Sequence, residues 1–530
     1  MFVRFAIAVG FATFLASAPF HLAVAAEPPA GAPKVVRIPI TFDPDSLDPH
    51  KTLGNSFVLD LFEGLTTWSA TNSVVPGMAT GWDTSPDGLT WTFHLRDALW
   101  SDGMPVTADD FVYSFRRALD PATAGPYTSV LSPIVGADAI SAGREKDMTK
   151  LGVEAPDPHT LRLKLLHPTP WLPALLATQV AMPVPRQAIE QWGDKWTAAE
   201  HMVDNGPFLL KKWVPLGEID FTRNPRFHDA ASVKIDEVDR ILAADPGAAL
   251  KQYEVGELDV AAVPGKDLPR LTKEHPAEML SAPVLGTGYL AVNMKGPLGA
   301  DARIRQALAL VIDRDVLENK IVRLGQLPAY TFLPPNMPGY ATPRPDWAGL
   351  SMPERIARAK QLLADAGAPR PLKLHLLSVD LDSYKRYTGA ITEMWHEALG
   401  IETEVETDEV RVALARLSHH DFEIAFNQWT ADYPDPATFL DLLSSTAGEL
   451  NPSGYANPGY DALLDQARTA KDPAARMKLL EASEALMLAD QPIIPLSHLV
   501  TQTLVSPKLH GYEAATLGRH PARFFSIGES

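Results

Sequence analysis

Strand-like and helix-like patterns alternate along this chain of 530 residues. Residues 89–95 alternate apolar and polar side chains over the length of one strand, and residues 34–40 do so more weakly. A helix is predicted directly after Thr107, which suits an N-cap, with Asp109 and Asp110 in the first turn. Because strands and helices are interleaved, the chain is predicted to be an α/β protein.

Two further helices are predicted from apolar spacing and capping residues. The first runs from Asp301 to about Lys320, where apolar side chains recur at intervals of three and four. These side chains are Ile304, Leu308, Val311, Ile312 and Val316. The second begins at Ser351, which forms a capping box with Glu354, and ends at Gly367.

Cysteine is absent from the sequence. The chain therefore has no disulfide, no thiol nucleophile and no cysteine metal ligand, and its stability must come from burial. The formal net charge of −18 argues against a nucleic-acid partner, which would require a basic surface.

The first 26 residues have the pattern of a secretory signal peptide. Arg4 precedes an apolar run over residues 5–18, and small residues at Ala23 and Ala25 offer a cleavage site near Ala25 or Ala26. The apolar run is shorter than the roughly 20 residues of a membrane span, which disfavours a retained anchor. We expect an exported protein.

The segment after the strand-like run at residues 422–426 combines an aromatic side chain, a carboxylate and two prolines. Trp429 and Asp432 are three residues apart, and Pro434 and Pro436 follow. Proline restricts the backbone, so a rigid loop with one negative charge is predicted. Asp432 suits a cationic ligand group, although a loop cap or a structural ion pair would use the same residue type.

Patterns typical of catalysis are incomplete in this sequence. His419-His420-Asp421 lacks further ligands at useful spacing, and His396-Glu397 lacks the second histidine of a zinc-protease helix. The sequence contains neither a nucleophile elbow nor a phosphate-binding loop. No catalytic residue, metal site or cofactor is predicted.

Several motifs occur in order along the chain. The longest are Gly88-Leu-Thr-Trp-Thr-Phe-His-Leu-Arg-Asp97 and Trp100-Ser-Asp-Gly-Met-Pro-Val-Thr-Ala-Asp-Asp-Phe-Val-Tyr-Ser114. The others are Ser46-Leu-Asp-Pro-His50, Asp60-Leu-Phe-Glu-Gly-Leu65, Asn205-Gly-Pro-Phe208, Asn224-Pro225, Asp313-Arg-Asp315, Leu327-Pro-Ala-Tyr330 and Ala431-Asp-Tyr433. Together they resemble the periplasmic oligopeptide- and dipeptide-binding proteins that feed ABC importers.

The resemblance implies a bilobed periplasmic-binding-protein fold with three domains and a ligand cleft between the lobes. The first lobe would combine residues 34–62, 184–283 and 501–530. Residues 63–183 would form an inserted domain, and residues 284–500 the second lobe.

The resemblance also implies roles for the segment around Asp432. The aspartate of a Trp-x-Ala-Asp-Tyr segment binds the peptide's amino terminus in this family, and Asp432 matches it. Main-chain groups of Gln428 and Thr430 match those that pair with the peptide backbone, with Trp429 beside them.

Five further positions are ligand-binding candidates by the same resemblance. Tyr127 and Tyr289 match aromatic residues that line the cleft, and Lys320 matches a lysine that contacts longer ligands. Phe426 replaces an arginine that receives the peptide's carboxylate, and Tyr384 replaces a nearby histidine. How this chain would hold a ligand's carboxyl end is therefore open.

The function implied is a monomeric periplasmic receptor that delivers oligopeptides to an ABC permease with cytoplasmic ATPases. A binding protein specialised for a murein peptide, a dipeptide, an opine or a nickel chelate is the alternative within transport. An exported peptide or glycan hydrolase is the alternative from another class, although no nucleophile motif supports it.

Overall fold

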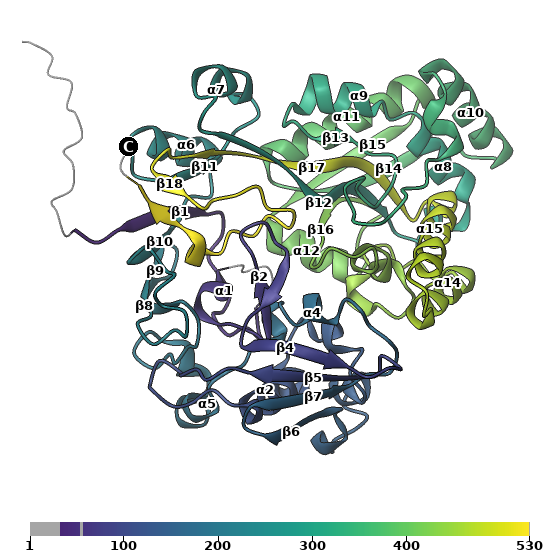
Figure 1. Cartoon of the computed structure of the whole chain (residues 1–530). Coiled ribbons are helices and arrows are strands. Elements are labelled where there is room, and N and C mark those ends of the chain that lie inside the picture. The colour runs from purple at the N-terminus through teal and green to yellow at the C-terminus, as the bar shows by residue number, and fades with distance from the viewer. Residues whose placement is uncertain (1–31, 53–56, 529–530) are drawn as a thin grey trace, which may run out of the picture. The chain divides into compact units, whose positions relative to one another are not determined.

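The computed structural model of the chain describes residues 32–52 and 57–528 (Figure 1). Contacts divide the chain into residues 1–33 and residues 34–530, and the second unit is described below. The predicted signal peptide lies outside the described residues. Within the described ranges, every helix is too short or too polar to span a lipid bilayer.

A four-stranded sheet combines the first strand of this unit with three strands from residues 208–242. The strand order is β1-β10-β9-β8, with β1 parallel to β10 and the other pairs antiparallel. The strands are β1 (Val35–Ile40), β8 (Phe208–Val214), β9 (Glu218–Arg223) and β10 (Glu237–Leu242). β1 confirms the strand predicted over residues 34–40.

A second four-stranded sheet is antiparallel throughout, in the order β4-β5-β7-β6. Its strands are β4 (Ala79–Thr84), β5 (Thr90–Leu95), β6 (Val153–Asp157) and β7 (Thr160–Lys164). β5 confirms the predicted strand, and α2 (Ala108–Leu119) confirms the helix after Thr107. Thr107 forms a capping box with Asp110, and α2 buries Phe111 and Phe115.

A seven-stranded mixed sheet forms the largest layer, in the order β11-β17-β12-β16-β14-β15, with β13 paired to β17. Its strands are β11 (Val260–Ala262), β12 (Met279–Val292), β13 (Leu327–Pro328), β14 (Lys373–Val379), β15 (Glu402–Asp408), β16 (Ile424–Thr430) and β17 (Ile493–Val505). The long strands β12 and β17 run side by side in Figure 1, and their register shifts between Pro283 and Thr287. Two small pairs, β2 (Thr66–Trp68) with β3 (Val74–Pro76) and β18 (Leu509–His510) with β19 (Ser526–Ile527), complete the strands.

Helices are interleaved with these strands, which confirms the α/β prediction. α10 (Met352–Asp365) has the predicted capping box of Ser351 and Glu354, and Gly367 follows it with φ +63°. The remaining helices are α1 (Val58–Leu61), α3 (Ala137–Ser141), α4 (Leu172–Leu175), α5 (Arg186–Trp192), α6 (Pro246–Glu254), α7 (Leu268–Glu274), α8 (Ala302–Leu310), α9 (Arg314–Val316), α11 (Asp382–Leu399), α12 (Val410–Ser418), α13 (Ala437–Leu440), α14 (Pro458–Thr469) and α15 (Pro473–Asp490).

The single helix predicted from Asp301 to Lys320 is wrong. The segment is divided into α8, α9 and a π-helix, η7 (Leu317–Val322). Asp313 caps the second part by accepting a hydrogen bond from the N–H of Val316 at 3.0 Å. The guanidinium of Arg314 donates to the carbonyls of Ala309 and Ile312, so a buried side chain satisfies the end of α8.

The loop predicted to follow residue 426 begins later than expected. β16 continues through Thr430, because its second half pairs with Gly286, Thr287 and Gly288 of β12. Gln428, Trp429 and Thr430 are therefore strand residues, and the loop starts at Ala431.

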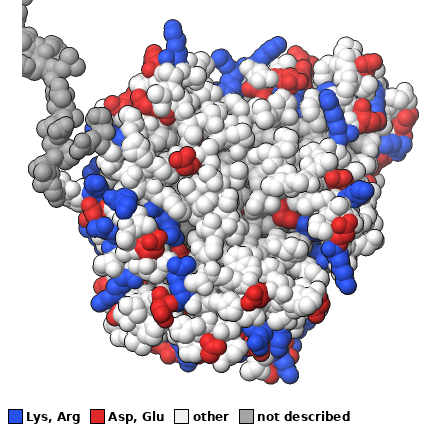
Figure 2. All heavy atoms as spheres, in the orientation of Figure 1, with Lys and Arg blue, Asp and Glu red and all other residues white. Residues whose placement is uncertain are grey.

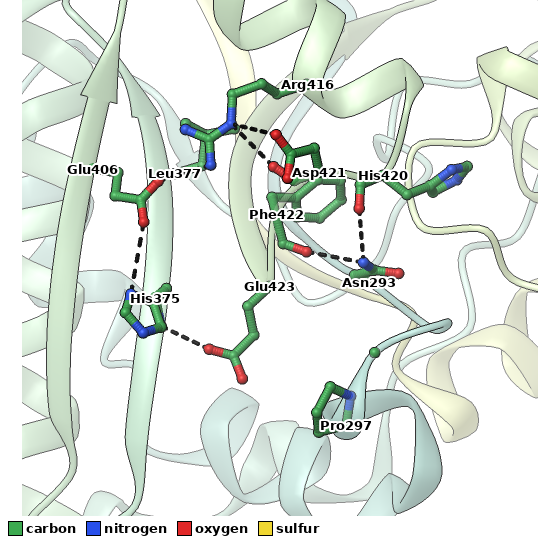
Figure 3. Close-up of a pocket in the computed structure, with 11 residues that line it drawn as sticks. Asn293, Pro297, His375, Leu377, Glu406, Arg416, His420, Asp421, Phe422 and Glu423 are labelled. Atoms are coloured by element: carbon green, nitrogen blue, oxygen red, sulfur yellow. Dashed lines mark hydrogen bonds and ion pairs between the residues drawn. The ribbon is translucent and has the colours of Figure 1, made fainter.

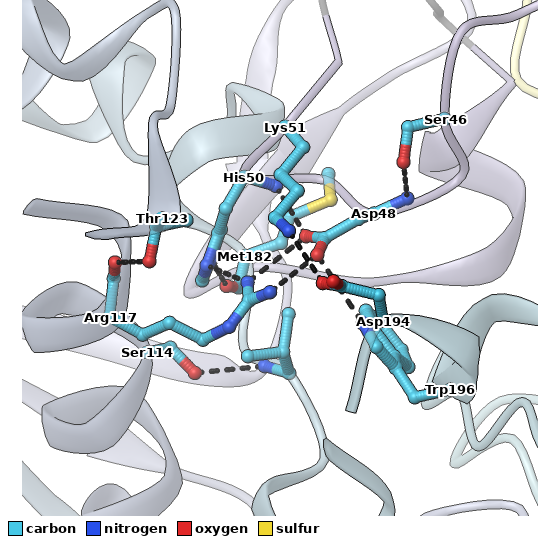
Figure 4. Close-up of polar contacts among 11 residues, drawn as sticks. Ser46, Asp48, His50, Lys51, Ser114, Arg117, Thr123, Met182, Asp194 and Trp196 are labelled. Carbon is cyan, nitrogen blue, oxygen red and sulfur yellow. Dashed lines mark hydrogen bonds and ion pairs between the residues drawn. The ribbon is translucent and has the colours of Figure 1, made fainter. Parts of the chain in front are cut away.

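A buried polar junction joins the first segment of the unit to α2 (Figure 4). The guanidinium of Arg117 donates to both carboxylate oxygens of Asp48, at 3.0 and 2.5 Å, and to Nδ1 of His50 at 2.9 Å. Because arginine only donates, Nδ1 must accept, and Nε2–H then donates to the carbonyl of Met182 at 3.1 Å. The indole of Trp196 donates to Asp48 at 3.3 Å. This arrangement requires a neutral imidazole.

Acid is expected to weaken this junction through His50. Burial, with Arg117 in contact, lowers the pKa of His50 from 6.5 to about 4. The stabilisation is therefore fully present above pH 6.5 and is lost as the pH falls through 6.5 toward 4. We expect the difference in unfolding free energy between the wild type and His50→Gln to shrink by about 3 kcal/mol between pH 7.5 and 4. Urea denaturation at each pH measures it, and a pH-independent difference would contradict a neutral buried His50.

Candidate ligand-binding site

The loop after β16 is held by hydrogen bonds on both sides of Asp432. The N–H of Asp432 donates to Oγ1 of Thr438 at 3.0 Å, and the indole of Trp429 donates to the carbonyl of Thr438 at 3.0 Å. Farther along, Asp435 accepts two hydrogen bonds from Arg476, each 2.7 Å long. The predicted rigidity of this loop therefore rests on side-chain contacts as well as on its prolines.

Asp432 meets side chains from two distant parts of the chain. The hydroxyl of Tyr127 donates to Oδ2 of Asp432, so the structure brings these two predicted site residues together. Nη2 of Arg519 lies 4.0 Å from Oδ1 of Asp432, and the two side chains are 15% and 20% exposed. The carboxylate thus lies where residues 127, 432 and 519 converge.

The environment of Asp432 favours a positive partner. Burial raises the pKa of Asp432, while Arg519 and the hydrogen bond from Tyr127 oppose that rise. Because the pKa of Asp432 is raised overall, these neighbours do not fully compensate for the hydration that its carboxylate loses on burial. A further cation in contact with this carboxylate would stabilise its ionised form.

Leu285 connects the Asp432 loop to the C-terminal segment through its main chain. Its carbonyl accepts from the N–H of Ala431 at 2.7 Å, and its own N–H donates to the carbonyl of Thr516 at 2.7 Å. Leu285 lies within the irregular part of β12 between Pro283 and Thr287. Leu285 therefore links the residue before Asp432 to the segment that leads to Arg519.

The second half of β16 has one open edge. β16 pairs with β12 along its length, from Ile424 to Thr430, whereas its parallel pairing with β14 covers only Ile424 and Ala425. Within residues 32–52 and 57–528, no strand pairs with β16 on the β14 side beyond Ala425. An unpaired edge presents N–H and C=O groups that can bind an added strand.

The alternation of the strand shows which groups face this open edge. The N–H of Ala431 points toward β12, where it bonds Leu285. Successive residues direct their main-chain groups to opposite sides, so those of Gln428 and Thr430 face the open edge. The N–H of Gln428 donates to the side chain of Asn427 at 2.9 Å, which satisfies it locally. Thr430 is exposed, and Gln428 and Trp429 are half-buried.

An aromatic group lies at the other end of this edge. Phe426 is 1% exposed and contacts Tyr384, with ring centroids 4.5 Å apart, and Tyr387, at 4.9 Å. The hydroxyl of Tyr387 donates to Glu318 at 2.9 Å. Burial raises the pKa of Glu318 to about 8 and that of Tyr384 to about 12. Phe426 is thus a core residue that supports the half-buried Tyr384.

Tyr289 and Lys320 occupy different environments. Tyr289 is 1% exposed on β12, and its hydroxyl accepts a hydrogen bond from Asn427 at 2.9 Å. Lys320 is exposed on η7 and forms no ion pair with any residue in the described part of the chain. The structure therefore brings Tyr127 to Asp432 and Tyr384 to Phe426. Lys320 lies on η7, which packs against α11, the helix that carries Tyr384.

Sequence reasoning missed Arg519 and Glu318. Arg519 lies between β18 and the 3-10 helix at Ala522–Phe524, where the sequence shows no periodic pattern. The only sequence signal for Glu318 was a charged residue among apolar ones in the predicted helix, where a solvent-exposed side chain would look the same.

Two cavities lie away from these residues. The larger, of about 350 Å³, is lined by residues that include His375, Glu406, Arg416 and Glu423 (Figure 3). Arg416 is already paired with Glu406 at 2.7 Å, so this charge is balanced within the protein. The other, of about 250 Å³, lies beside Trp347 and α15. Neither is lined by a predicted site residue, and the described residues contain no cluster of three or more potential metal ligands.

The charged side chains form no continuous patch of one sign on the face shown in Figure 2. Lysine and arginine are interspersed with aspartate and glutamate, mainly toward the margins.

The model of the bacterial extracellular solute-binding proteins, family 5, matches residues 73–451. The chain belongs to this family. The chain is similar to the periplasmic oligopeptide-binding protein OppA of Escherichia coli K12, with 37% identity over 506 residues that cover 93% of each chain. The fold is that of the bilobed periplasmic binding proteins.

Several solved structures are similar to this chain over nearly its whole length. Haemophilus influenzae OppA in complex with RPPGFSPFR has a TM-score of 0.88 at 32% identity, covering 94% of this chain and 99% of that one. The Escherichia coli murein tripeptide-binding protein MppA has the same TM-score at 33% identity, covering 94% and 99%. Its unliganded open form, covering 94% and 98%, has a TM-score of 0.74. The fold of this chain is thus less similar to the open form of MppA than to the other MppA structure.

Proposed function

We propose that this chain is a periplasmic receptor that binds extended oligopeptides and delivers them to an ABC permease with cytoplasmic ATPases. The open edge of β16, with Asp432 directly beyond it, is the observation that carries the proposal. The names of the relatives OppA and MppA support a peptide ligand. A signal peptide cleaved near Ala25 or Ala26 would place the receptor, as a monomer, in the periplasm.

In this proposal the peptide adds as a strand to β16. Its ammonium group would contact Asp432, and its backbone would run antiparallel to β16 past Thr430 and Gln428 toward Tyr384. Strand geometry gives roughly 20 Å between Asp432 and Phe426, the length of about six extended residues. Main-chain pairing uses groups that every peptide has, which gives affinity without requiring one sequence.

We propose that β12 and β17 connect the lobes, since both cross the boundaries expected from the resemblance. β12 runs from Met279 to Val292, across the boundary at residues 283 and 284, and β17 runs across the one at residues 500 and 501. Bending at the irregular segment between Pro283 and Thr287 would open the cleft to a ligand. Tyr127 would then separate from Asp432, because the two residues belong to different proposed domains.

Backbone methylation of the ligand tests the added strand. In an alanine pentapeptide with a free amino terminus, we expect N-methylation to weaken binding with a period of two. Each methyl group that faces β16 removes a hydrogen bond and should cost about 1–3 kcal/mol, whereas the alternate positions face away. Calorimetric titration of the singly methylated series measures this, and the alternate positions are the matched controls. Equal losses at every position would contradict strand addition.

A further inference from the structure

Arg519 is fixed in place by a buried asparagine. The side chain of Asn72 donates to the carbonyl of Arg519 at 2.8 Å and accepts from its N–H at 3.2 Å. The same amide oxygen accepts from the N–H of Leu517 at 3.0 Å, and Asn72 is 2% exposed. The next turn is also tied down, because the N–H of Ala522 donates to Asp60 at 2.8 Å. The backbone that carries Arg519 is thus preorganised.

The guanidinium of Arg519 is held in position but lacks a hydrogen-bond acceptor. It lies 5.2 Å from the ring centroid of Trp68 and 4.0 Å from Asp432. It donates no hydrogen bond to any residue of ranges 32–52 and 57–528. Its side chain is only 15% exposed, and burial lowers the pKa of Arg519. A guanidinium has five N–H donors in a planar fork that matches a carboxylate, so an anionic acceptor would fit here.

The charges of Asp432 and Arg519 also favour a ligand that carries both a positive and a negative group. Asp432 and Arg519 together are neutral, and Tyr127, which contacts Asp432, stays uncharged because burial raises its pKa. A ligand that brings only an ammonium group would leave one uncompensated positive charge in a mostly buried site. An uncompensated buried charge is unfavourable, whereas an ammonium with a nearby carboxylate keeps the site neutral.

We propose that Asp432 and Arg519 form a two-charge subsite that selects peptides whose first residue carries a side-chain carboxylate. The inference rests on the proposed function, because it places the peptide's ammonium group at Asp432. The carboxylate of an amino-terminal glutamate or aspartate lies a few ångströms from its own ammonium, and the 4.0 Å contact requires a similar separation. A free α-amino acid also carries an ammonium and a carboxylate close together, so it is the other ligand that could bring this pair of charges.

Calorimetric titration of the mature chain with Glu-Ala-Ala-Ala and Gln-Ala-Ala-Ala tests the subsite. These peptides differ by one charge and are nearly isosteric. We expect the wild type to bind the glutamate peptide about ten- to hundredfold more tightly, as for a charge-assisted hydrogen bond. Arg519→Met should remove this preference, because the glutamate carboxylate then has no cationic partner, and the affinities of this variant for the two peptides should agree within about threefold. Equal affinities of the wild type for both peptides would overturn the inference.

Lys508→Met is the matched control, because Lys508 is an exposed cation in the same C-terminal segment. This variant should keep the full preference for the glutamate peptide. If it lost the preference, the effect of Arg519 would be one of overall positive charge and not of direct contact. If free glutamate binds as tightly as the glutamate peptide, the subsite recognises amino acids, and the proposal that it selects peptides is overturned. If neither peptide binds, the proposed function fails; if both bind equally, only this inference fails.

Discussion

Asp432→Asn is expected to weaken the binding of peptides with a free amino terminus by about 3–5 kcal/mol, about two to four orders of magnitude in Kd. The substitution keeps the shape of the side chain and removes its charge. It leaves the ligand's ammonium group facing Arg519, whose guanidinium lies 4.0 Å from the carboxylate in the wild type. Two mostly buried cations without a carboxylate between them repel each other, and this repulsion adds to the lost ion pair.

The comparison that isolates this contact uses N-acetylated peptides. Acetylation removes the ammonium charge, so we expect Asp432→Asn to change their affinity by less than about 1 kcal/mol. Calorimetric titration of both peptide forms measures the difference. Asp421→Asn is the matched control, because its side chain is 78% exposed and precedes the same strand. An equal loss for free and acetylated peptides would rule out Asp432 as the amino-terminal anchor.

Local signals in the sequence predicted local structure well. The capping boxes at Thr107 and Ser351 depend on residues three positions apart, so both helix starts could be located from a few letters. The same holds for β1 and β5, whose apolar alternation sets one face against the core. These features need no information about the rest of the chain.

The helix predicted over residues 301–320 failed because its break depends on a distant contact. The apolar spacing continues without interruption, yet Arg314 turns inward to donate to the carbonyl of Pro495 at 2.9 Å. An arginine in an apolar helix is usually assumed to be solvent-exposed, and here it is fully buried. Asp313 caps the new turn locally, but the inward position of Arg314 depends on β17 and leaves no trace in the apolar spacing.

The candidate site was predicted in part, since its residues come from separate segments. The resemblance indicated Asp432 and Tyr127, which lie 305 positions apart and are in contact. Arg519 left no signal, because its position depends on Asn72 far away in the sequence. The open edge of β16 was also invisible, as it depends on where β14 stops pairing. Pairing partners, unlike caps, are set by the tertiary fold.

Arg476→Met is expected to destabilise the protein by about 3–5 kcal/mol, because it leaves a buried carboxylate unpaired. Arg476 donates to both oxygens of Asp435 at 2.7 Å, and the two side chains are 8% and 12% exposed. The guanidinium also lies 3.8 Å from the ring centroid of Trp171. Since Asp435 belongs to the same loop as Asp432, peptide affinity should fall together with stability. Urea denaturation and titration of the folded variant measure the two effects.

Arg468→Met is the matched control for this change. Arg468 pairs with Asp441 at 2.7 Å, but these side chains are 29% and 41% exposed, so water screens the pair. Removing it should cost about 0–1 kcal/mol and leave peptide binding unchanged. Such a result would show that the burial of an ion pair, and not its presence alone, determines how much it stabilises the loop. Equal destabilisation by the two variants would show that the loop is supported by its prolines and backbone contacts, with no special role for Asp435.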